Sequence, residues 1–223
     1  MILVFVVVLA ILIADQYLKF WVKTTMTLRE EIDVFGDWFK LHFTENEGMA
    51  FGLILPGSWG KLFLTFFRLI AVSGIIYYLV YQIKRNIDTL TVVLISLILA
   101  GALGNIIDSV FYGRWFTEST AFELGRWAGA DEGYGTLFHG KVVDMLYFPL
   151  FSGTYPDWSP YRPGQSFTFF SAIFNIADAA ISVGLFAILI FKRSLFSPKP
   201  EETSVEDEED NQTPEILEET PAS

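Results

Sequence analysis

Cysteine is absent from the 223 residues of this sequence. Without cysteine, the chain cannot be a disulfide scaffold, a cysteine-ligated zinc or iron–sulfur protein, or a thiol enzyme. Only two histidines are present and neither lies in an HExxH sequence, which disfavours a zinc peptidase. The GxSxG, GxGxxG and phosphate-loop sequences are also missing, so we expect no metal, nucleotide or redox cofactor.

Basic residues are too few to form the positive face that a nucleic-acid partner requires. The net charge is -11, and ten of the 26 acidic residues lie in residues 200–223, which contain no Lys or Arg. The rest of the chain therefore holds 16 acidic against 15 basic residues. A sequence that is 52% hydrophobic and only 18% charged is typical of a membrane protein. We expect residues 198–223 to form an acidic, disordered, cytoplasmic tail.

Four apolar stretches are each long enough to cross about 30 Å of hydrocarbon as a helix. They cover residues 1–22, 62–82, 87–110 and 167–191. The first stretch has neither the basic start nor the cleavage site of a signal peptide, so we expect it to remain as a span. The sequence thus predicts an all-α membrane protein with four transmembrane helices, in a membrane domain of residues 1–197.

Basic residues predict the orientation of these spans. Lys84 and Arg85 lie in the short link between the second and third spans, and a second basic pair follows the fourth. By the positive-inside rule, both termini are cytoplasmic, and the loops of residues 23–61 and 111–166 are extracytoplasmic. Residues 38–44 are rich in β-forming side chains, which predicts a small extracytoplasmic β element.

Ionisable and amide side chains inside the spans are candidates for function, because they are costly in hydrocarbon. Asp15 and Lys19 lie four residues apart on one face of the first span, with the acid first, which favours a structural ion pair. Asn105 and Asp108 lie at the outer end of the third span, where they can either hold helices together or line a site.

The fourth span contains Asn175 and Asp178, and Asp178 has no Lys or Arg within one helical turn. This aspartate therefore needs either a partner from elsewhere in the chain or a proton, and such perturbed carboxyl groups mark functional sites. Two adjacent carboxyl groups can share one proton and act as base and acid on a peptide bond, as in aspartic proteases. Asp108 and Asp144, the latter in an apolar stretch of the second outer loop, are both open as the partner.

Five short blocks of the sequence resemble the bacterial lipoprotein signal peptidases, the signal peptidase II family of aspartic peptidases (family A8). Each block alone is weak, whereas all five in the right order on a four-span frame are specific. Over most of residues 1–192, the blocks are DQYLK at 15–19, NEGMAFG at 46–52, GNIID at 104–108, VVD at 142–144 and FNIAD at 174–178.

The resemblance implies a membrane aspartyl endopeptidase that cuts diacylglyceryl-modified prolipoproteins just before the lipidated cysteine. It assigns Asp144 and Asp178 as the catalytic dyad. The expected partners are this precursor and membrane lipids, without nucleic acid, metal or cofactor. We expect a monomer in the bacterial inner membrane, with the active site facing the extracytoplasmic side.

The resemblance also implies residues that support the site or bind substrate, and it agrees with a structural role for Asp15 and Lys19. The supporting residues are Asn46, Gly48, Asn105, Asp108 and Asn175. Ser109 stands where the family usually has an arginine, and we expect Arg114 to reach the same space.

Two other interpretations fit the same residues. The chain can be a non-catalytic four-span protein, such as a transporter or assembly factor, whose aspartates hold helices together or conduct a cation. It can also be an inactive family member, as Ser109 suggests. Processing of a lipidated precursor by the purified protein distinguishes the peptidase from both.

Overall fold

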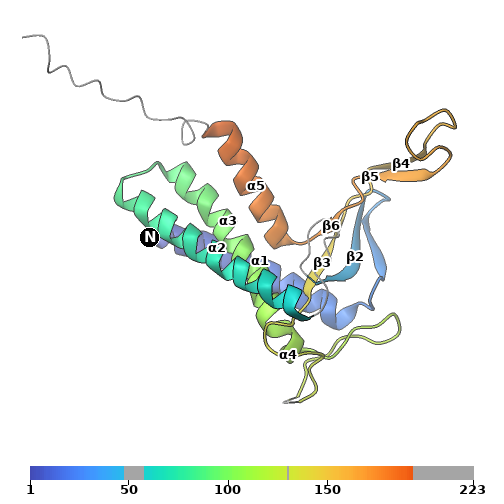
Figure 1. The fold of residues 1–223 in the computed structure, drawn as a ribbon, viewed down its shortest axis with the longest axis horizontal. Coiled ribbons are helices and arrows are strands. Elements are labelled where there is room, and N and C mark those ends of the chain that lie inside the picture. The colour runs from blue at the N-terminus through green and yellow to red at the C-terminus, as the bar shows by residue number, and fades with distance from the viewer. Residues whose placement is uncertain (48–57, 130, 193–223) are drawn as a thin grey trace, which may run out of the picture. The chain divides into compact units, whose positions relative to one another are not determined.

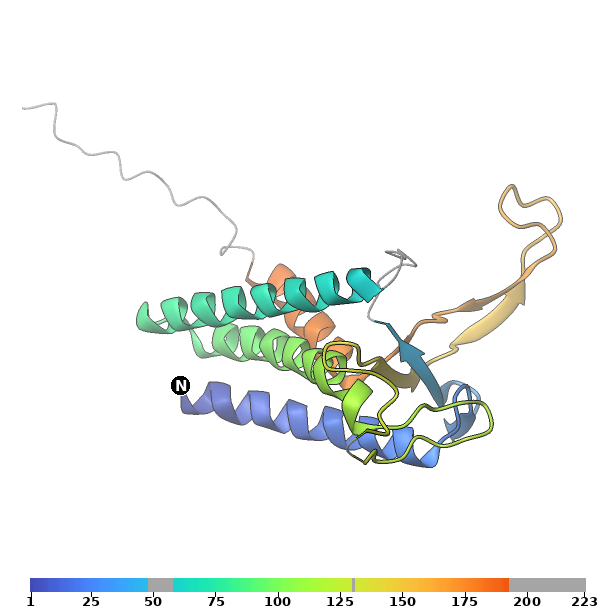
Figure 2. The same cartoon turned by 60° about the horizontal axis from the view of Figure 1, so that its bottom comes forward.

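Long helices make up most of the computed structural model, which describes residues 1–47, 58–129 and 131–192. They are α1 (Ile2–Thr25), α2 (Ser58–Lys84), α3 (Thr89–Ile107) and α5 (Ile176–Phe191). Helix α3 contacts each of the other three, and Figures 1 and 2 show strands gathered beyond one end of the helices. After α3 the chain continues as a π-helical turn, η1 (Asp108–Tyr112), and the short α4 (Gly113–Trp115).

Three helical segments of the described chain are long and apolar enough to cross a membrane: Ile2–Thr25, Leu62–Lys84 and Thr89–Trp115. They lie within a few residues of the first three predicted spans. Large apolar side chains stay exposed along these helices and along α5, among them Phe5, Ile70, Tyr77, Phe186 and Ile190. Exposed apolar faces of this kind are what lipid-facing helices require.

The fourth predicted span, residues 167–191, was wrong at its beginning. Only Ile176–Phe191 is helical, 16 residues in all, and it is preceded by strands β5 (Ser166–Phe169) and β6 (Ile173–Phe174). Asn175 ends the strand because its extended backbone and side-chain oxygen cap the helix, accepting a hydrogen bond from the Asp178 N–H.

Small residues, in the sequence GALG at residues 101–104 and at Gly184, let α3 and α5 approach closely. A Cβ added at Gly101 would lie 2.1 Å from the carbonyl oxygen of Ala177, and one at Gly104 would lie 3.1 Å from the Cβ of Ala177. A Cβ at Gly184 of α5 would lie 2.7 Å from the carbonyl oxygen of Leu94. These contacts bring the polar end of α3 directly against the first turn of α5.

A four-stranded antiparallel sheet joins the two long loops between the helices, in the order β1-β2-β3-β6. Strands β1 (Glu31–Phe35) and β2 (Phe39–Asn46) come from the first loop, where a β element was predicted. Strand β3 (Val142–Tyr147) comes from the second loop, whose strands the sequence pattern did not reveal. Strands β4 (Phe151–Thr154) and β5 form a separate aromatic hairpin, which projects beyond the sheet in Figure 1.

A buried apolar cluster fixes this sheet on the C-terminal end of α1. It contains Val22, Met26, Phe43, Tyr112, Phe116, Val143 and Met145. Successive side chains of a strand point to opposite faces, so Val143 and Met145 enter this cluster while Asp144 points to the other face of β3. That alternation turns Asp144 away from the apolar cluster.

Charged side chains also join the sheet to α1. Lys23 of α1 forms an ion pair with Glu45 of β2, and its Nζ donates to Ser119 Oγ at 2.9 Å. The Nζ of Lys141 lies 3.3 Å from Glu45 Oε2. These contacts hold β2 and the second loop against α1, next to the strand that carries Asp144.

Candidate active site

Lys19 is the centre of a fully buried polar cluster between α1 and α3. Its Nζ lies 2.9 Å from Asp15 Oδ2 and 2.8 Å from Asp108 Oδ2, and it donates to Asn105 Oδ1 at 3.0 Å. An ammonium group has three protons, and these three acceptors use all of them. The buried cation thus joins two carboxyl groups and an amide oxygen, so the cluster can hold a further hydrogen-bond network in place.

Asp108 is held from several directions at once. Besides Lys19, its Oδ1 accepts from Gln16 Nε2 at 2.9 Å, and its Oδ2 accepts from the backbone N–H of Val143 at 3.3 Å. Gln16 in turn accepts a 3.2 Å hydrogen bond from the Tyr112 hydroxyl. The carboxylate thus ties α1 and α3 to β3, one residue before Asp144.

The first turn of α5 begins at this cluster. Asp15 Oδ1 accepts from the Ala177 N–H at 2.9 Å, and Asn175 Oδ1 accepts from the Asp178 N–H at 2.9 Å. These two contacts satisfy N–H groups that a helix start otherwise leaves without partners. They set the position of Asp178, which lies in that same turn.

Two asparagine amides connect the remaining aspartates. Asn175 Nδ2 donates to Asp144 Oδ1 at 2.7 Å, and Asn105 Nδ2 donates to Asp178 Oδ1 at 2.7 Å. Asn175 Nδ2 also lies 3.2 Å from Asn105 Oδ1, so the two amides are linked to each other. Each carboxyl group therefore has its own amide donor, and both amides connect back to Lys19.

Asp144 is nearly fully buried, and burial raises the pKa of its carboxyl group to about 7. The negative charge of Asp178 raises this pKa further, whereas Lys19 and hydrogen bonds from Asn175 and Asn46 oppose the rise. A carboxyl group with such a pKa holds a proton through a large part of the neutral range, which an ordinary aspartate does not. The pair can therefore offer one protonated and one ionised carboxyl group together.

The predicted supporting residues lie in different places. Asn46 forms a hydrogen bond with Asp144, and Thr44 is the partner of Asp144 in the register of β2 and β3. Gly48 falls outside the described residues. The Arg114 side chain is exposed on α4 and, within residues 1–47, 58–129 and 131–192, makes no hydrogen bond or ion pair.

Sequence reasoning assigned no role to two residues of this region. Gln16 bridges Asp15 and Asp108, and Arg68 of α2 donates from Nη1 to Ser109 Oγ at 3.0 Å. Arg68 could have been found from the sequence, because it is the only charged residue in the apolar part of α2.

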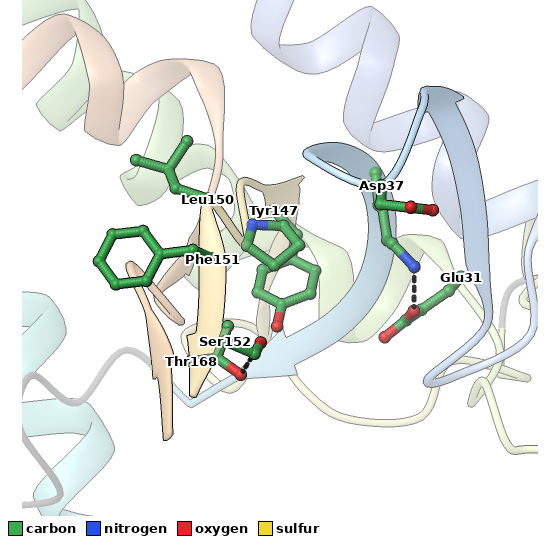
Figure 3. A pocket seen from close by; sticks show the side chains of 9 residues that line it. Glu31, Asp37, Tyr147, Leu150, Phe151, Ser152 and Thr168 are labelled. Carbon is green, nitrogen blue, oxygen red and sulfur yellow. Dashed lines mark hydrogen bonds and ion pairs between the residues drawn. The ribbon is translucent and has the colours of Figure 1, made fainter. Parts of the chain in front are cut away.

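A cavity of about 380 Å³ lies elsewhere, between the β1–β2 hairpin and the β4–β5 hairpin (Figure 3). Its charged lining residues are Glu31, Asp37 and Lys40, and Lys40 Nζ lies 3.6 Å from Glu31 Oε2. These groups are partly or fully exposed, unlike the buried polar cluster. The cavity contains neither Asp144 nor Asp178 in its lining.

The helices and the buried polar cluster define a class: a multi-span membrane protein with two neighbouring carboxyl groups where its helices meet a small sheet. Comparison with known proteins gives the family. The model of the family described as "Signal peptidase (SPase) II" matches residues 7–194. This chain is therefore a peptidase of the signal peptidase II family.

Individual relatives agree with that family. A lipoprotein signal peptidase of Porphyromonas gingivalis is 46% identical over 184 residues, covering 82% of this chain and 79% of the relative. One from Amoebophilus asiaticus is 39% identical, covering 91% of this chain and 84% of the relative. A solved structure described as a bacterial membrane enzyme is 25% identical with a TM-score of 0.57, covering 89% of this chain and 92% of its own.

Proposed function

We propose that this peptidase removes the signal peptide from diacylglyceryl-modified prolipoproteins by cutting just before the lipidated cysteine, with Asp144 and Asp178 as its catalytic dyad. The observation that carries the proposal is the pair of amide hydrogen bonds that fixes these two carboxyl groups side by side. Asn175 holds Asp144, and Asn105 holds Asp178, each at 2.7 Å. Asp108, in contrast, is occupied by Lys19 and by the Val143 N–H.

Proton positions follow from the environments of the two carboxyl groups. The raised pKa of Asp144 makes it the group that carries the shared proton and donates it to the oxygen of the scissile carbonyl. Asp178 takes a proton from water, whose oxygen attacks the carbonyl carbon. Collapse of the resulting tetrahedral diol breaks the C–N bond. The proton from Asp178 passes to the departing amino group of the cysteine, and a hydroxyl of the diol returns a proton to Asp144, which restores the dyad.

The depth of the site suits this substrate. A precursor's signal helix spans the bilayer and its diacylglyceryl chains lie in the lipid, which places the scissile bond near the outer interface. The carboxyl pair lies between the outer end of α3, the start of α5 and the outer sheet, where water can reach a peptide bond. Exposed apolar faces of the helices provide contacts for acyl chains and for the signal helix.

We infer the same topology that the sequence predicted, with α5 as the fourth span and both termini cytoplasmic. At about 1.5 Å per residue, the 16 residues of α5 cover about 24 Å. A span this short is accommodated by local thinning of the bilayer and by basic residues that reach the headgroups. We also propose that the enzyme acts as a monomer, and that residues 198–223 form a separate tail.

The test is processing of a purified precursor in detergent. The full chain is mixed with a diacylglyceryl-modified prolipoprotein and, in parallel, with the same precursor lacking the lipid. Mass spectrometry should find a new N-terminal lipidated cysteine in the first reaction only. Cutting of the unlipidated precursor at an equal rate would contradict the proposed substrate, and no cutting of either would contradict the activity.

A further inference from the structure

Arg68 is an arginine in the apolar helix α2. It belongs neither to the ion-pair cluster around Lys19 nor to the Asp144–Asp178 dyad. It is the only charged residue between Leu62 and Ile83 of α2. An arginine within a membrane span is costly, and such residues are retained where they meet a substrate or a specific partner. Its side chain is partly buried.

Ser109 fixes one nitrogen of this guanidinium. The hydroxyl of Ser109 donates to the Asn105 carbonyl oxygen at 2.8 Å and accepts from Arg68 Nη1 at 3.0 Å. Ser109 is buried on the π-helical turn η1, directly after Asp108. Turns of this kind interrupt α-helices mainly at functional sites, and here the turn presents the hydroxyl toward α2.

The charge of Arg68 lies beside the dyad. Its guanidinium interacts electrostatically with Asp178, Asp108 and Asp144, and the interaction with Asp178 is the strongest of the three. Lys19 is also close to this group, but its three protons are committed to buried acceptors. Arg68 instead comes from α2, and its partly buried side chain lies next to the dyad.

We propose that Arg68 is a substrate-binding residue, whose guanidinium donates hydrogen bonds to a main-chain carbonyl of the precursor beside the scissile bond while Ser109 holds it in place. A guanidinium has five N–H donors in a rigid fork, a shape that can hold a serine hydroxyl and a peptide carbonyl together. A phosphate headgroup is disfavoured as the ligand, because the surrounding aspartates repel an anion. This inference rests on the proposed peptidase function.

Steady-state kinetics of the full chain in detergent provide the first test. Arg68→Ala should lower kcat/KM for the diacylglyceryl precursor by about 10- to 100-fold, the range expected for losing charge-assisted hydrogen bonds. Arg68→Lys keeps the charge without the fork and should recover only part of this loss. Arg85→Ala, at the opposite end of α2, is the matched control and should leave the kinetics unchanged.

Binding provides a readout that does not depend on cleavage. A fluorescent diacylglyceryl precursor is titrated into Asp144→Asn with and without Arg68→Ala, and the second substitution should raise Kd at least tenfold. The double variant Arg68→Ala, Ser109→Arg places a guanidinium on the other side of the 3.0 Å contact between the two residues. Its kcat/KM should be at least tenfold higher than that of Arg68→Ala alone.

A purely structural tie between α2 and α3 gives different results. In that case Arg68→Ala would lower the Tm while Kd and the kinetics of the folded fraction stayed at wild-type values, which would overturn the proposal. Failure of the peptidase function appears separately, as a wild-type chain that binds the precursor without cutting it. An unchanged Kd in the Arg68→Ala background would overturn the role of Arg68 whether or not cleavage occurs.

Discussion

At the scale of single residues, the cluster separates aspartates that stabilise the fold from aspartates left for chemistry. Asp15 and Asp108 each contact Lys19 and each also accept a backbone N–H, from Ala177 and Val143 respectively. Asp144 and Asp178 each accept from a neutral amide and have each other as charged neighbours. A neighbouring carboxylate favours the protonated form of a carboxyl group, as it does for Asp144.

Burial of Asp144 has a measurable consequence for stability. Its folded-state pKa of about 7 lies above the ordinary value of 3.8, so the folded protein binds this proton more tightly than the unfolded chain. The resulting stability is fully present below the ordinary pKa, falls as the pH rises through about 7, and is absent above it. Asp144→Asn carries no charge and should unfold at a Tm several degrees above wild type at pH 8.

Thermal unfolding in detergent, followed by tryptophan fluorescence at pH 4.5 and pH 8, checks this expectation. The advantage of Asp144→Asn over wild type should shrink toward zero at the lower pH, since both side chains are then neutral. An exposed aspartate of the second loop, Asp157, supplies the control, because Asp157→Asn should show no such pH-dependent difference. A constant Tm difference at both pH values would contradict a buried carboxyl group with a raised pKa.

The sequence identified the polar residues of this cluster more easily than their pairings. Asp15, Asn105 and Asp178 stand out because they interrupt apolar runs. The choice between Asp108 and Asp144 as neighbour of Asp178 depends on contacts between residues 30 or more positions apart, which local spacing does not contain. Arg68 could have been singled out in the same way as the aspartates, but its contact with Ser109 joins separate helices.

At the scale of elements, the start of α5 decides where Asp178 lies. Asn175 caps the helix through its side-chain oxygen and holds Asp144 through its side-chain nitrogen. Asn175→Ala removes both functions and should cost about 1–2 kcal/mol in stability as well as most of the activity. Asn175→Ser keeps a capping oxygen but has no amide, so it should retain near-normal stability while activity still falls.

Chemical denaturation and precursor cleavage, measured on the same preparations, separate these two roles. Equal loss of stability in both Asn175 variants would contradict the capping role. Full activity in Asn175→Ser would contradict the role of the amide in holding Asp144.

The contact between α3 and α5 supplies a second prediction. A Cβ at Gly104 would lie 2.8 Å from Asp15 Oδ2 and 3.1 Å from the Cβ of Ala177. Gly104→Ala should therefore destabilise the protein by about 1–3 kcal/mol and displace the start of α5, with loss of activity. Gly74 of α2 has nothing within 4 Å of an added Cβ, so Gly74→Ala is the matched control and should be neutral or slightly stabilising.

Stability in detergent and precursor cleavage are compared for the two alanine variants. Equal stability of Gly104→Ala and Gly74→Ala would contradict the close packing of α3 on α5.

Helices were easier to predict than strands, for a physical reason. A span of about 20 apolar residues is a local signal, and the first three helices begin and end within a few residues of the predicted limits. Strand β3 gains its stability by pairing with β2, which is far away in sequence, and the two-residue β6 by pairing with β3. The same pairing takes residues 173–174 away from the predicted fourth span, whose apolar composition alone indicated a longer helix.

At the scale of the whole molecule, the proposed topology puts every strand on the outer side of the membrane. The absence of cysteine makes this testable with single cysteine variants, because no native thiol interferes. Phe122→Cys, at a side chain that is 93% exposed in the second outer loop, should react with a membrane-impermeant maleimide in intact cells. Thr89→Cys, at the opposite end of α3, should react only after the membrane is opened.

Labelling in intact and permeabilised cells, read as a mass shift on a gel, gives the result for each position. Reaction of position 89 but not 122 in intact cells would contradict the proposed orientation, and reaction of both would contradict α3 as a span.

Catalysis by the Asp144–Asp178 pair is tested by one cleavage measurement. The wild-type chain, Asp144→Asn, Asp178→Asn and the control Asp157→Asn are each incubated with a diacylglyceryl precursor, and product is followed by gel shift. Wild type and Asp157→Asn should cut the precursor, while both dyad variants, still folded, should lose at least a thousandfold in rate. Wild-type rates in either folded dyad variant would contradict the catalytic role of the pair.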